Sequence, residues 1–148
     1  MYKHIMLPLD GSELSAKTVK ESLAFAKSIG AKLTAIHVVS RYHVILDEGF
    51  TSKGLRAIEK DHEELSKKSA RKILDKVENL AKAEGVECEG MVVVGDHPYQ
   101  AIIDHAAKRK CDLILMASHG RRGLEGLLLG SETVKVLTHS KIPVLVVR

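Results

Sequence analysis

The residues best suited to chemistry gather in one glycine-rich segment, residues 116–131, which reads MASHGRRGLEGLLLGS. Its glycines allow the backbone to approach a ligand closely, and Arg121 and Arg122 can neutralise phosphate. Gly130 and Ser131 open a predicted helix, whose free amides and dipole favour an anion, and the serine hydroxyl can donate a further hydrogen bond. This spacing favours phosphate binding, while an ordinary loop followed by an N-cap serine fits the same residues.

The sequence lacks the motifs of several other chemistries. A Walker A loop needs a Gly-Lys pair, which is absent, and the dinucleotide fingerprint follows the first strand of its fold, whereas this segment follows the fourth predicted strand. There is no G-x-S-x-G elbow for acyl transfer and no H-E-x-x-H or tight Cys/His cluster for zinc. We therefore expect neither an acyl-transfer nucleophile nor a zinc site.

A few single residues could also carry chemistry. Asp10 follows the first predicted strand, where its carboxylate can cap the next helix. His37 lies in a buried strand pattern, which favours a satisfied core histidine over a ligand. Cys88 and Cys111 are far apart in the sequence and are interpreted as unreactive.

Around these residues, strand and helix patterns alternate along the chain. The predicted strands are residues 3–9, 32–39, 86–94, 112–117 and 142–147, and the predicted helices are residues 13–29, 55–84, 99–108 and 131–140. This order predicts a mostly parallel sheet with helices on both faces. Ligands of such sheets bind beyond the carboxyl ends of the strands, which directs attention to residues 8–12, 38–39 and 117–131.

Apolar residues at helical spacing predict which helix faces are buried. In the longest predicted helix they are Leu55, Ile58, Leu65, Ala70, Ile73, Val77, Leu80 and Ala81, and in the next helix they are Ile102, Ile103, Ala106 and Ala107. Residues 40–54 show no clear period, so they are interpreted as a connection that is functional, mobile or partly helical.

Length and composition limit the classes of function. A chain of 148 residues with 45% hydrophobic and 28% charged residues fits one globular domain, residues 1–148. The net charge is +4, the Lys and Arg residues alternate with acidic residues along the chain, and only 3% of residues are aromatic. A nucleic-acid surface is therefore not expected. No apolar run is long enough for a membrane span or a secretory signal, and two cysteines fit a reducing cytoplasm.

The glycine-rich segment resembles the nucleotide loop of the universal stress protein family, which reads G-x-x-G, nine residues, then G-S/T. Gly120, the nine residues after it, Gly130 and Ser131 fit this pattern, and Ala117 stands at the first glycine. Four other stretches resemble the family in the same order, namely residues 7–12, 37–39, 95–98 and 142–147. Together the matches cover nearly the whole chain.

The resemblance implies a site for ATP, or for AMP or ADP, with Mg²⁺ or Mn²⁺ on the nucleotide. Asp10 matches the acid near the ribose or the phosphate-bound metal, Pro8 lines the same pocket, and the backbone of Val38 matches the position that reads adenine. The end of the fourth strand, Met116 and Ala117, matches the contact with ribose and base. Gly120, Gly130, Ser131 and Glu132 match the family's phosphate cradle, and Ser118, His119 and Arg121 of the same segment are further candidate contacts with the nucleotide. His119 could either touch phosphate or simply be exposed.

The same resemblance implies an open five-stranded parallel sheet in the order 3-2-1-4-5, a Rossmann-like fold of the adenine nucleotide alpha hydrolase type. In that order the apolar strand 142–147 lies at an edge, and a second copy of the chain can cover it. We therefore expect a cytoplasmic homodimer, joined through Val144–Val147, that binds an adenine nucleotide and regulates a stress response with a protein partner that the sequence does not identify.

Two other functions fit the same fold. One is an enzyme that cleaves or transfers an adenylyl group, but no residue is an evident general base, so hydrolysis of ATP should be slow. The other is a dimeric interaction module without nucleotide, and Ala117 is the feature in its favour. Fold alone does not decide between them.

Overall fold

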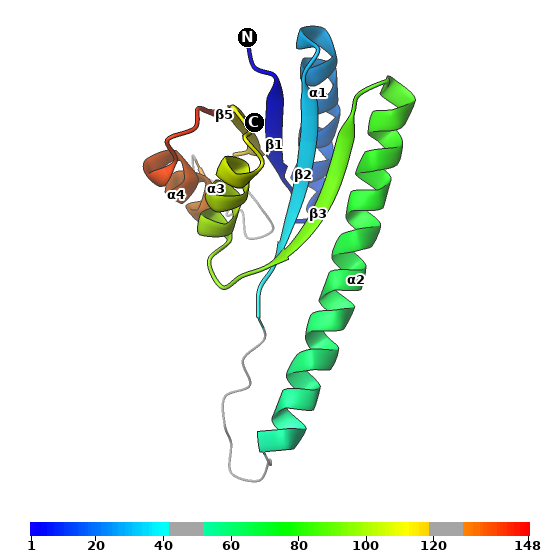
Figure 1. Cartoon of the computed structure of the whole chain (residues 1–148), viewed down its shortest axis with the longest axis vertical. Coiled ribbons are helices and arrows are strands. Elements are labelled where there is room, and N and C mark those ends of the chain that lie inside the picture. The colour runs from blue at the N-terminus through cyan, green and yellow to red at the C-terminus, as the bar shows by residue number, and fades with distance from the viewer. Residues whose placement is uncertain (42–51, 119–128) are drawn as a thin grey trace.

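The computed structural model describes residues 1–41, 52–118 and 129–148. Its strands are β1 (His4–Pro8), β2 (Lys32–Val39), β3 (Cys88–Val94), β4 (Leu113–Ala117) and β5 (Val144–Val147). Its helices are α1 (Glu13–Ile29), α2 (Ser52–Glu84), α3 (Pro98–Lys108) and α4 (Ser131–His139). Strands and helices alternate along the chain (Figure 1), as the sequence predicts.

The five strands form one parallel sheet in the order β3-β2-β1-β4-β5. β1 lies at the centre, where Pro8 pairs with Ile36 of β2 and Ile5 pairs with Leu113 of β4. β5 lies at one edge and β3 at the other. The predicted fold class and strand order are therefore confirmed.

Helices cover both faces of the sheet (Figure 1). The helices that follow β1 and β2 bury one set of side chains against the sheet: Val19, Leu23 and Ala26 of α1, and Leu74, Val77 and Ala81 of α2. The helices that follow β3 and β4 bury another set on the opposite face: Ile102 and Ala106 of α3, and Val136 of α4. The connecting helices therefore change face between α2 and α3, which makes the space between β1 and β4 the topological switch point.

The ends of several elements differ from the predicted ones for local reasons. β3 begins at Cys88 rather than Val86, because the Val86 N–H donates to Ala81 C=O and still closes the end of α2. β5 begins at Val144 rather than Ile142, after Pro143, which has no N–H to donate. α2 begins at Ser52, before the predicted start at Leu55.

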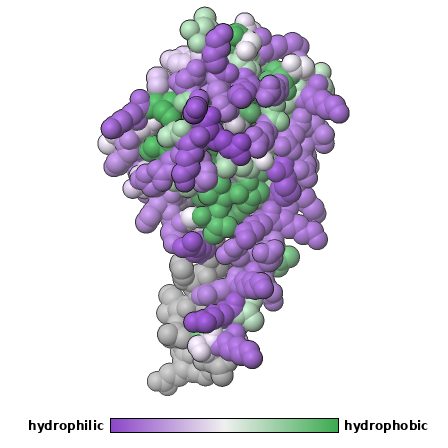
Figure 2. Space-filling model, in the orientation of Figure 1, coloured by the Kyte–Doolittle hydropathy of each residue, from purple (hydrophilic) through white to green (hydrophobic). Residues whose placement is uncertain are grey.

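The predicted apolar stripe of α2 is partly wrong. Ile58, Leu65 and Leu80 are 44%, 67% and 48% exposed, whereas Leu74, which the pattern omits, is fully buried. Ile58 and Leu65 lie in the N-terminal half of α2, which extends beyond the sheet (Figure 1), so these two side chains have no strand to pack against. Hydrophilic side chains cover most of the visible face, including much of α2 (Figure 2). In α3, Ala107 is likewise exposed rather than buried.

Candidate functional site

The central strand is shorter at its carboxyl end than its two neighbours. The last bond between β1 and β2 runs from Leu9 N–H to Ile36 C=O, at 2.9 Å, while β2 continues to Val39. Peptide groups point to alternate sides along a strand, so the N–H and C=O of Val38 point the same way as those of Ile36, into the space beyond the end of β1. Val38, which the resemblance assigns to adenine recognition, therefore presents an open peptide edge to the space beyond the end of β1.

The other side of this space is closed by the end of β4 and the first turn of α4. Ser118 N–H donates to Val147 C=O at 2.8 Å, and Gly130 N–H donates to Ser118 C=O at 2.7 Å. Thr133 Oγ1 donates to Ala117 C=O at 3.0 Å. These bonds hold the start of α4 against the carboxyl ends of β4 and β5.

The first turn of α4 offers backbone donors to an anion. Gly130 C=O accepts the first helical bond, from Val134 N–H at 3.0 Å, so the N–H groups of residues 131–133 precede the helical ladder. Ser131 is exposed and Glu132 is half-buried at the helix start. The Gly130 N–H already donates to Ser118 C=O, so the amides left for an anion in this turn are those of residues 131–133.

Ala117 occupies its position without backbone strain. It is the last residue of β4 and pairs with Val147 of β5. Among the described residues, Lys110 is the one non-glycine residue with a positive φ, so Ala117 has the ordinary backbone of a strand. A methyl group is compatible with this conformation, and the position does not require glycine.

Asp10 shapes the turn between β1 and α1. Its Oδ1 accepts the Ser12 N–H at 2.9 Å, Gly11 adopts a φ of +77°, and Ser12 C=O accepts the first helical bond of α1 from Ala16 N–H. The carboxylate therefore supports the turn in an Asx arrangement while lying at the carboxyl edge of the sheet. Pro8, half-buried, ends β1 just before this turn.

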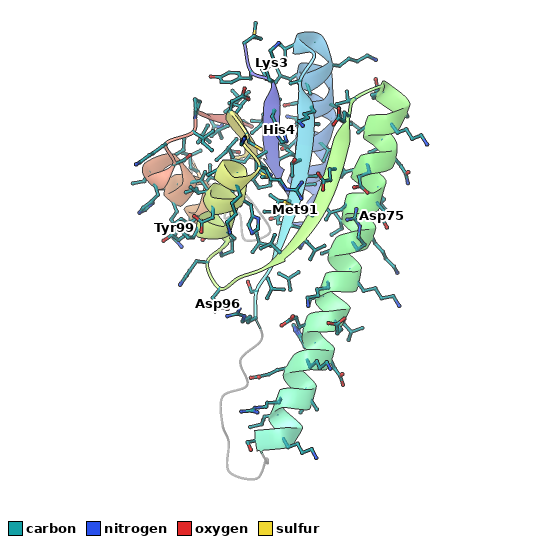
Figure 3. The ribbon with its side chains drawn as sticks, viewed as in Figure 1. Lys3, His4, Asp75, Met91, Asp96 and Tyr99 are labelled. Carbon is teal, nitrogen blue, oxygen red and sulfur yellow. The ribbon has the colours of Figure 1, made fainter. Side chains whose placement is uncertain are left out.

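The side chain of Glu132 bridges α3 and its own helix. Its Oε2 accepts Tyr99 N–H at 2.9 Å, and its Oε1 accepts Lys135 Nζ at 2.9 Å. The Lys135 ammonium also lies 5.5 Å from the centre of the Tyr99 ring, and the hydrogen bond to Glu132 raises the pKa of Lys135. Tyr99 is labelled in Figure 3, on the side of α3 next to α4.

The predicted site residues therefore fall into three groups. Pro8, Asp10, Val38, Ala117, Ser118, Gly130, Ser131 and Glu132 come together at the carboxyl edge of the sheet. Met116 is 6% exposed and packs in the core beneath α3 and α4. His119, Gly120 and Arg121 lie outside the described residues.

Sequence reasoning missed several residues that shape this edge. The sequence analysis does not include Thr133 in the site. Its position two residues after Ser131 is a signal that could have placed it in the first turn of the helix. No sequence pattern identifies Tyr99 and Lys135 as part of this edge, because their contact with Glu132 depends on how α3 and α4 pack. Arg41 and Asp96, which follow β2 and β3, form an ion pair of 3.5 Å at the same edge, and Asp96 is labelled in Figure 3.

The described part of the chain gives little support for thiol chemistry or for a metal site built from protein side chains alone. Burial raises the pKa of the Cys88 and Cys111 thiols to about 11, so both stay protonated at neutral pH. In residues 1–41, 52–118 and 129–148, no three side chains among His, Cys, Asp and Glu gather into a metal site. None of the helices in these ranges combines the length and apolar character needed to cross a membrane.

Comparison with known proteins relates the whole chain to one family. The model of the universal stress protein family matches residues 1–148. Universal stress protein MJ0531 of Methanocaldococcus jannaschii is 34% identical over 148 residues, which cover 100% of this chain and 83% of that protein.

Solved structures agree with this relationship. The structure of MJ0577, from the same organism, is 28% identical and has a TM-score of 0.84, covering 99% of this chain and 96% of that one. A universal stress protein solved in complex with cAMP is 26% identical, with a TM-score of 0.70 over 99% of this chain and 97% of that one.

Proposed function

Because the chain belongs to the universal stress protein family, we propose that it binds an adenine nucleotide at the carboxyl edge of its sheet. The observation that carries this proposal is the pairing of two features across the end of β1. One is the open peptide edge of Val38, which suits a base, and the other is the first turn of α4, whose free N–H groups suit a phosphate. The cAMP complex of a relative supports the same class of ligand.

The residues present also fit a divalent ion carried by the nucleotide. Mg²⁺ in nucleotide sites is held by one or two carboxylates together with phosphate oxygens and water. Asp10 supplies a carboxylate at this edge, in a turn already fixed by the bond from Ser12 N–H. A bound ion would offset phosphate charge, and ATP with Mg²⁺ or Mn²⁺ remains our proposal for the complete ligand.

The identity of the ligand can be tested directly. The protein, purified without added nucleotide, is denatured and the released small molecules are identified by mass spectrometry. We expect an adenine nucleotide in amounts comparable to the protein. Release of no nucleotide, together with no binding of ATP, ADP, AMP or cAMP in titrations, would favour the interaction module without nucleotide.

We further propose a homodimer joined through β5. Ile114 N–H donates to Pro143 C=O, and Ser118 N–H donates to Val147 C=O, so the carbonyl groups of Pro143 and Val147 face β4. Because peptide groups alternate in direction along a strand, those of Val144 and Val146 face the open edge of the sheet. Exposed apolar side chains lie on β5 and on α4, namely Leu145, Val134 and Leu137, at 39%, 45% and 41%. An apolar edge of this kind favours pairing with a second copy.

A single charge at this edge tests the dimer. In Val146→Asp, two-fold symmetry would bring two carboxylates into one apolar contact, which leaves them poorly solvated. We expect a wild-type dimer and a monomeric or aggregated variant in analytical ultracentrifugation at micromolar concentration. A wild-type monomer, or a variant that dimerises normally, would exclude this interface.

The proposed location is the cytoplasm, where a stress regulator would meet its nucleotide. Cys88 and Cys111 are both free thiols, as expected in a reducing compartment.

A further inference from the structure

Three residues at the start of α4 are tied to other parts of the fold, two to the end of β4 and one to α3. Gly130 bonds through its amide to Ser118, Thr133 through its hydroxyl to Ala117, and Glu132 through its carboxylate to the backbone of Tyr99. Ser131 lies between them and is exposed. The turn is therefore held in place before any ligand arrives, with its outward amides fixed relative to β4 and α3.

Glu132 provides the cap that α3 does not make for itself. The N-cap residue of α3, His97, makes no side-chain capping bond, and the Tyr99 N–H in the first turn of α3 is taken by Glu132 instead. Lys135 binds the other carboxylate oxygen and lies over the Tyr99 ring. We call Tyr99, Glu132 and Lys135 the Glu132 clip.

The Glu132 clip places a negative charge in the same helical turn as the amides proposed for phosphate. A carboxylate there repels every further negative charge that the ligand brings, and the repulsion grows with the number of phosphates. Lys135 offsets part of it, but the ion pair is partly exposed, with side chains 48% and 37% accessible, so the offset is incomplete. The base, which is neutral, is unaffected.

We infer that the Glu132 clip sets how much affinity the site gains from each added phosphate, lowering the affinity for nucleoside triphosphates more than that for monophosphates. This inference rests on the proposed function, because it concerns the phosphate end of the same adenine nucleotide site. Glu132 acts here as a positioning and specificity residue: it fixes the first turn of α4 through Tyr99 and penalises ligand charge through its carboxylate.

The test compares adenosine, AMP and ATP with Mg²⁺ by calorimetric titration into the full chain. Glu132→Gln keeps an oxygen that can accept the Tyr99 N–H but removes the charge. We expect unchanged affinity for adenosine, an increase of about threefold for AMP and about tenfold for ATP, with the gain shrinking in 1 M salt. Lys135→Met, which keeps an alkyl chain over Tyr99, should weaken ATP more than AMP.

A matched pair on α2 supplies the control. Glu64 and Lys67 have the same i,i+3 spacing as Glu132 and Lys135, at 3.5 Å, but lie on another helix. Glu64→Gln removes the same net charge and should leave all three affinities unchanged. If wild type binds AMP and ATP but Glu132→Gln leaves their ratio as it was, this inference is wrong while the proposed function stands. If wild type binds none of the three ligands, both fail.

Discussion

At the residue scale, three helices end with the same backbone geometry, but one of them has a residue with a side chain where the other two have glycine. After α1, α2 and α3 the chain closes with the same pair of bonds, as in Cys111 N–H to Ala106 C=O and Lys110 N–H to Ala107 C=O. The residue that carries the positive φ is glycine after α1 and α2, but lysine after α3, where Lys110 has a φ of +56°. A side chain in this left-handed conformation is strained, whereas glycine is not.

We therefore expect Lys110→Gly to stabilise the protein. Relief of strain at this position should raise the free energy of unfolding by about 0.5–1 kcal/mol, measured by urea denaturation. The matched control is Gly85→Ala, at a φ of +73° after α2, which should lower stability by about 1 kcal/mol. Equal stability of Lys110→Gly and wild type would contradict the assignment of strain.

At the element scale, α2 protects the exposed edge of β3. The outward N–H of Gly90 donates to Glu78 Oε1, and its C=O accepts from Arg71 Nη1 at 3.0 Å, so two helix side chains occupy peptide groups that a neighbouring strand would otherwise use. Arg71 also pairs with Glu78 at 2.6 Å. Gly90 permits this close approach, because a Cβ there would lie 2.9 Å from Leu74 Cβ and 2.8 Å from Arg71 Nη2.

Adding a methyl group at this contact should separate α2 from β3. We expect Gly90→Ala to lower the free energy of unfolding by about 1–3 kcal/mol, since the neighbouring Leu74 is fully buried and must move. At Gly95 a Cβ would meet Ala101 Cβ at 3.7 Å, an ordinary contact, so Gly95→Ala is the control and should change stability much less. Similar losses in both variants would show that the α2 contact is not the cause.

His4 links β1, β2 and α3, and it makes stability depend on pH. Its Nε2 lies 2.8 Å from Thr34 Oγ1, and burial together with Lys32 lowers its pKa below the usual 6.5, although a bond to the Arg109 backbone and the charge of Asp112 act in the opposite direction. Burial, the largest cause, also lowers the pKa of His105 on α3. The folded protein therefore binds fewer protons than the unfolded chain just below pH 6.5.

The sign of the pH dependence follows. Stability contributed by neutral His4 is complete above pH 6.5 and is lost as the pH falls from 6.5 toward the lowered pKa of the folded state. We expect unfolding free energies measured from pH 7.5 to 5.5 to decrease, and the decrease to be smaller in His4→Gln. A slope that His4→Gln leaves intact would assign the effect to other groups.

Asp112 makes the stability depend on pH in a separate, more acidic range. Desolvation tends to raise the pKa of Asp112, but hydrogen bonds from His4 N–H and Lys3 N–H outweigh it and lower the pKa below 3.8. The stability from these bonds is present above pH 3.8 and is lost below it, so it does not interfere with the range in which His4 titrates.

At the scale of the whole molecule, the alternation of short apolar runs with helical patterns was sufficient to predict a mostly parallel sheet with helices on both faces, whereas the order of the strands came from the resemblance to the family. The carboxyl ends of the strands could be located for the same reason, which placed Asp10, Val38 and Ser131 at one edge. What local patterns do not contain is the packing of elements far apart in the sequence. The contact of Glu132 with Tyr99 and the use of the Gly130 amide by Ser118 both depend on such packing.

The prediction of the apolar stripe of α2 was partly wrong for a similar reason, because it also depends on how distant elements pack. Periodicity indicates which residues share a helix face, but it does not show where the helix leaves the sheet. Ile58 and Leu65 lie in the half of α2 that extends beyond the sheet, whereas Leu74 is buried where glycine in β3 lets the helix come close. Helix length and strand length together decide which part of a stripe is covered.

The central claim, that the first turn of α4 holds the phosphate of an adenine nucleotide, is tested most directly by titrating ATP with Mg²⁺ into wild type and Gly130→Val. Gly130 has φ −70° and ψ 154°, an extended conformation that valine readily adopts, so the variant should fold normally. Its branched side chain would stand beside the amides of residues 131–133 and obstruct a phosphate. We predict saturable binding by wild type and a loss of at least about tenfold in affinity, or 1.4 kcal/mol, in the variant, with unchanged circular dichroism. Equal ATP affinity in the two folded proteins would contradict the claim.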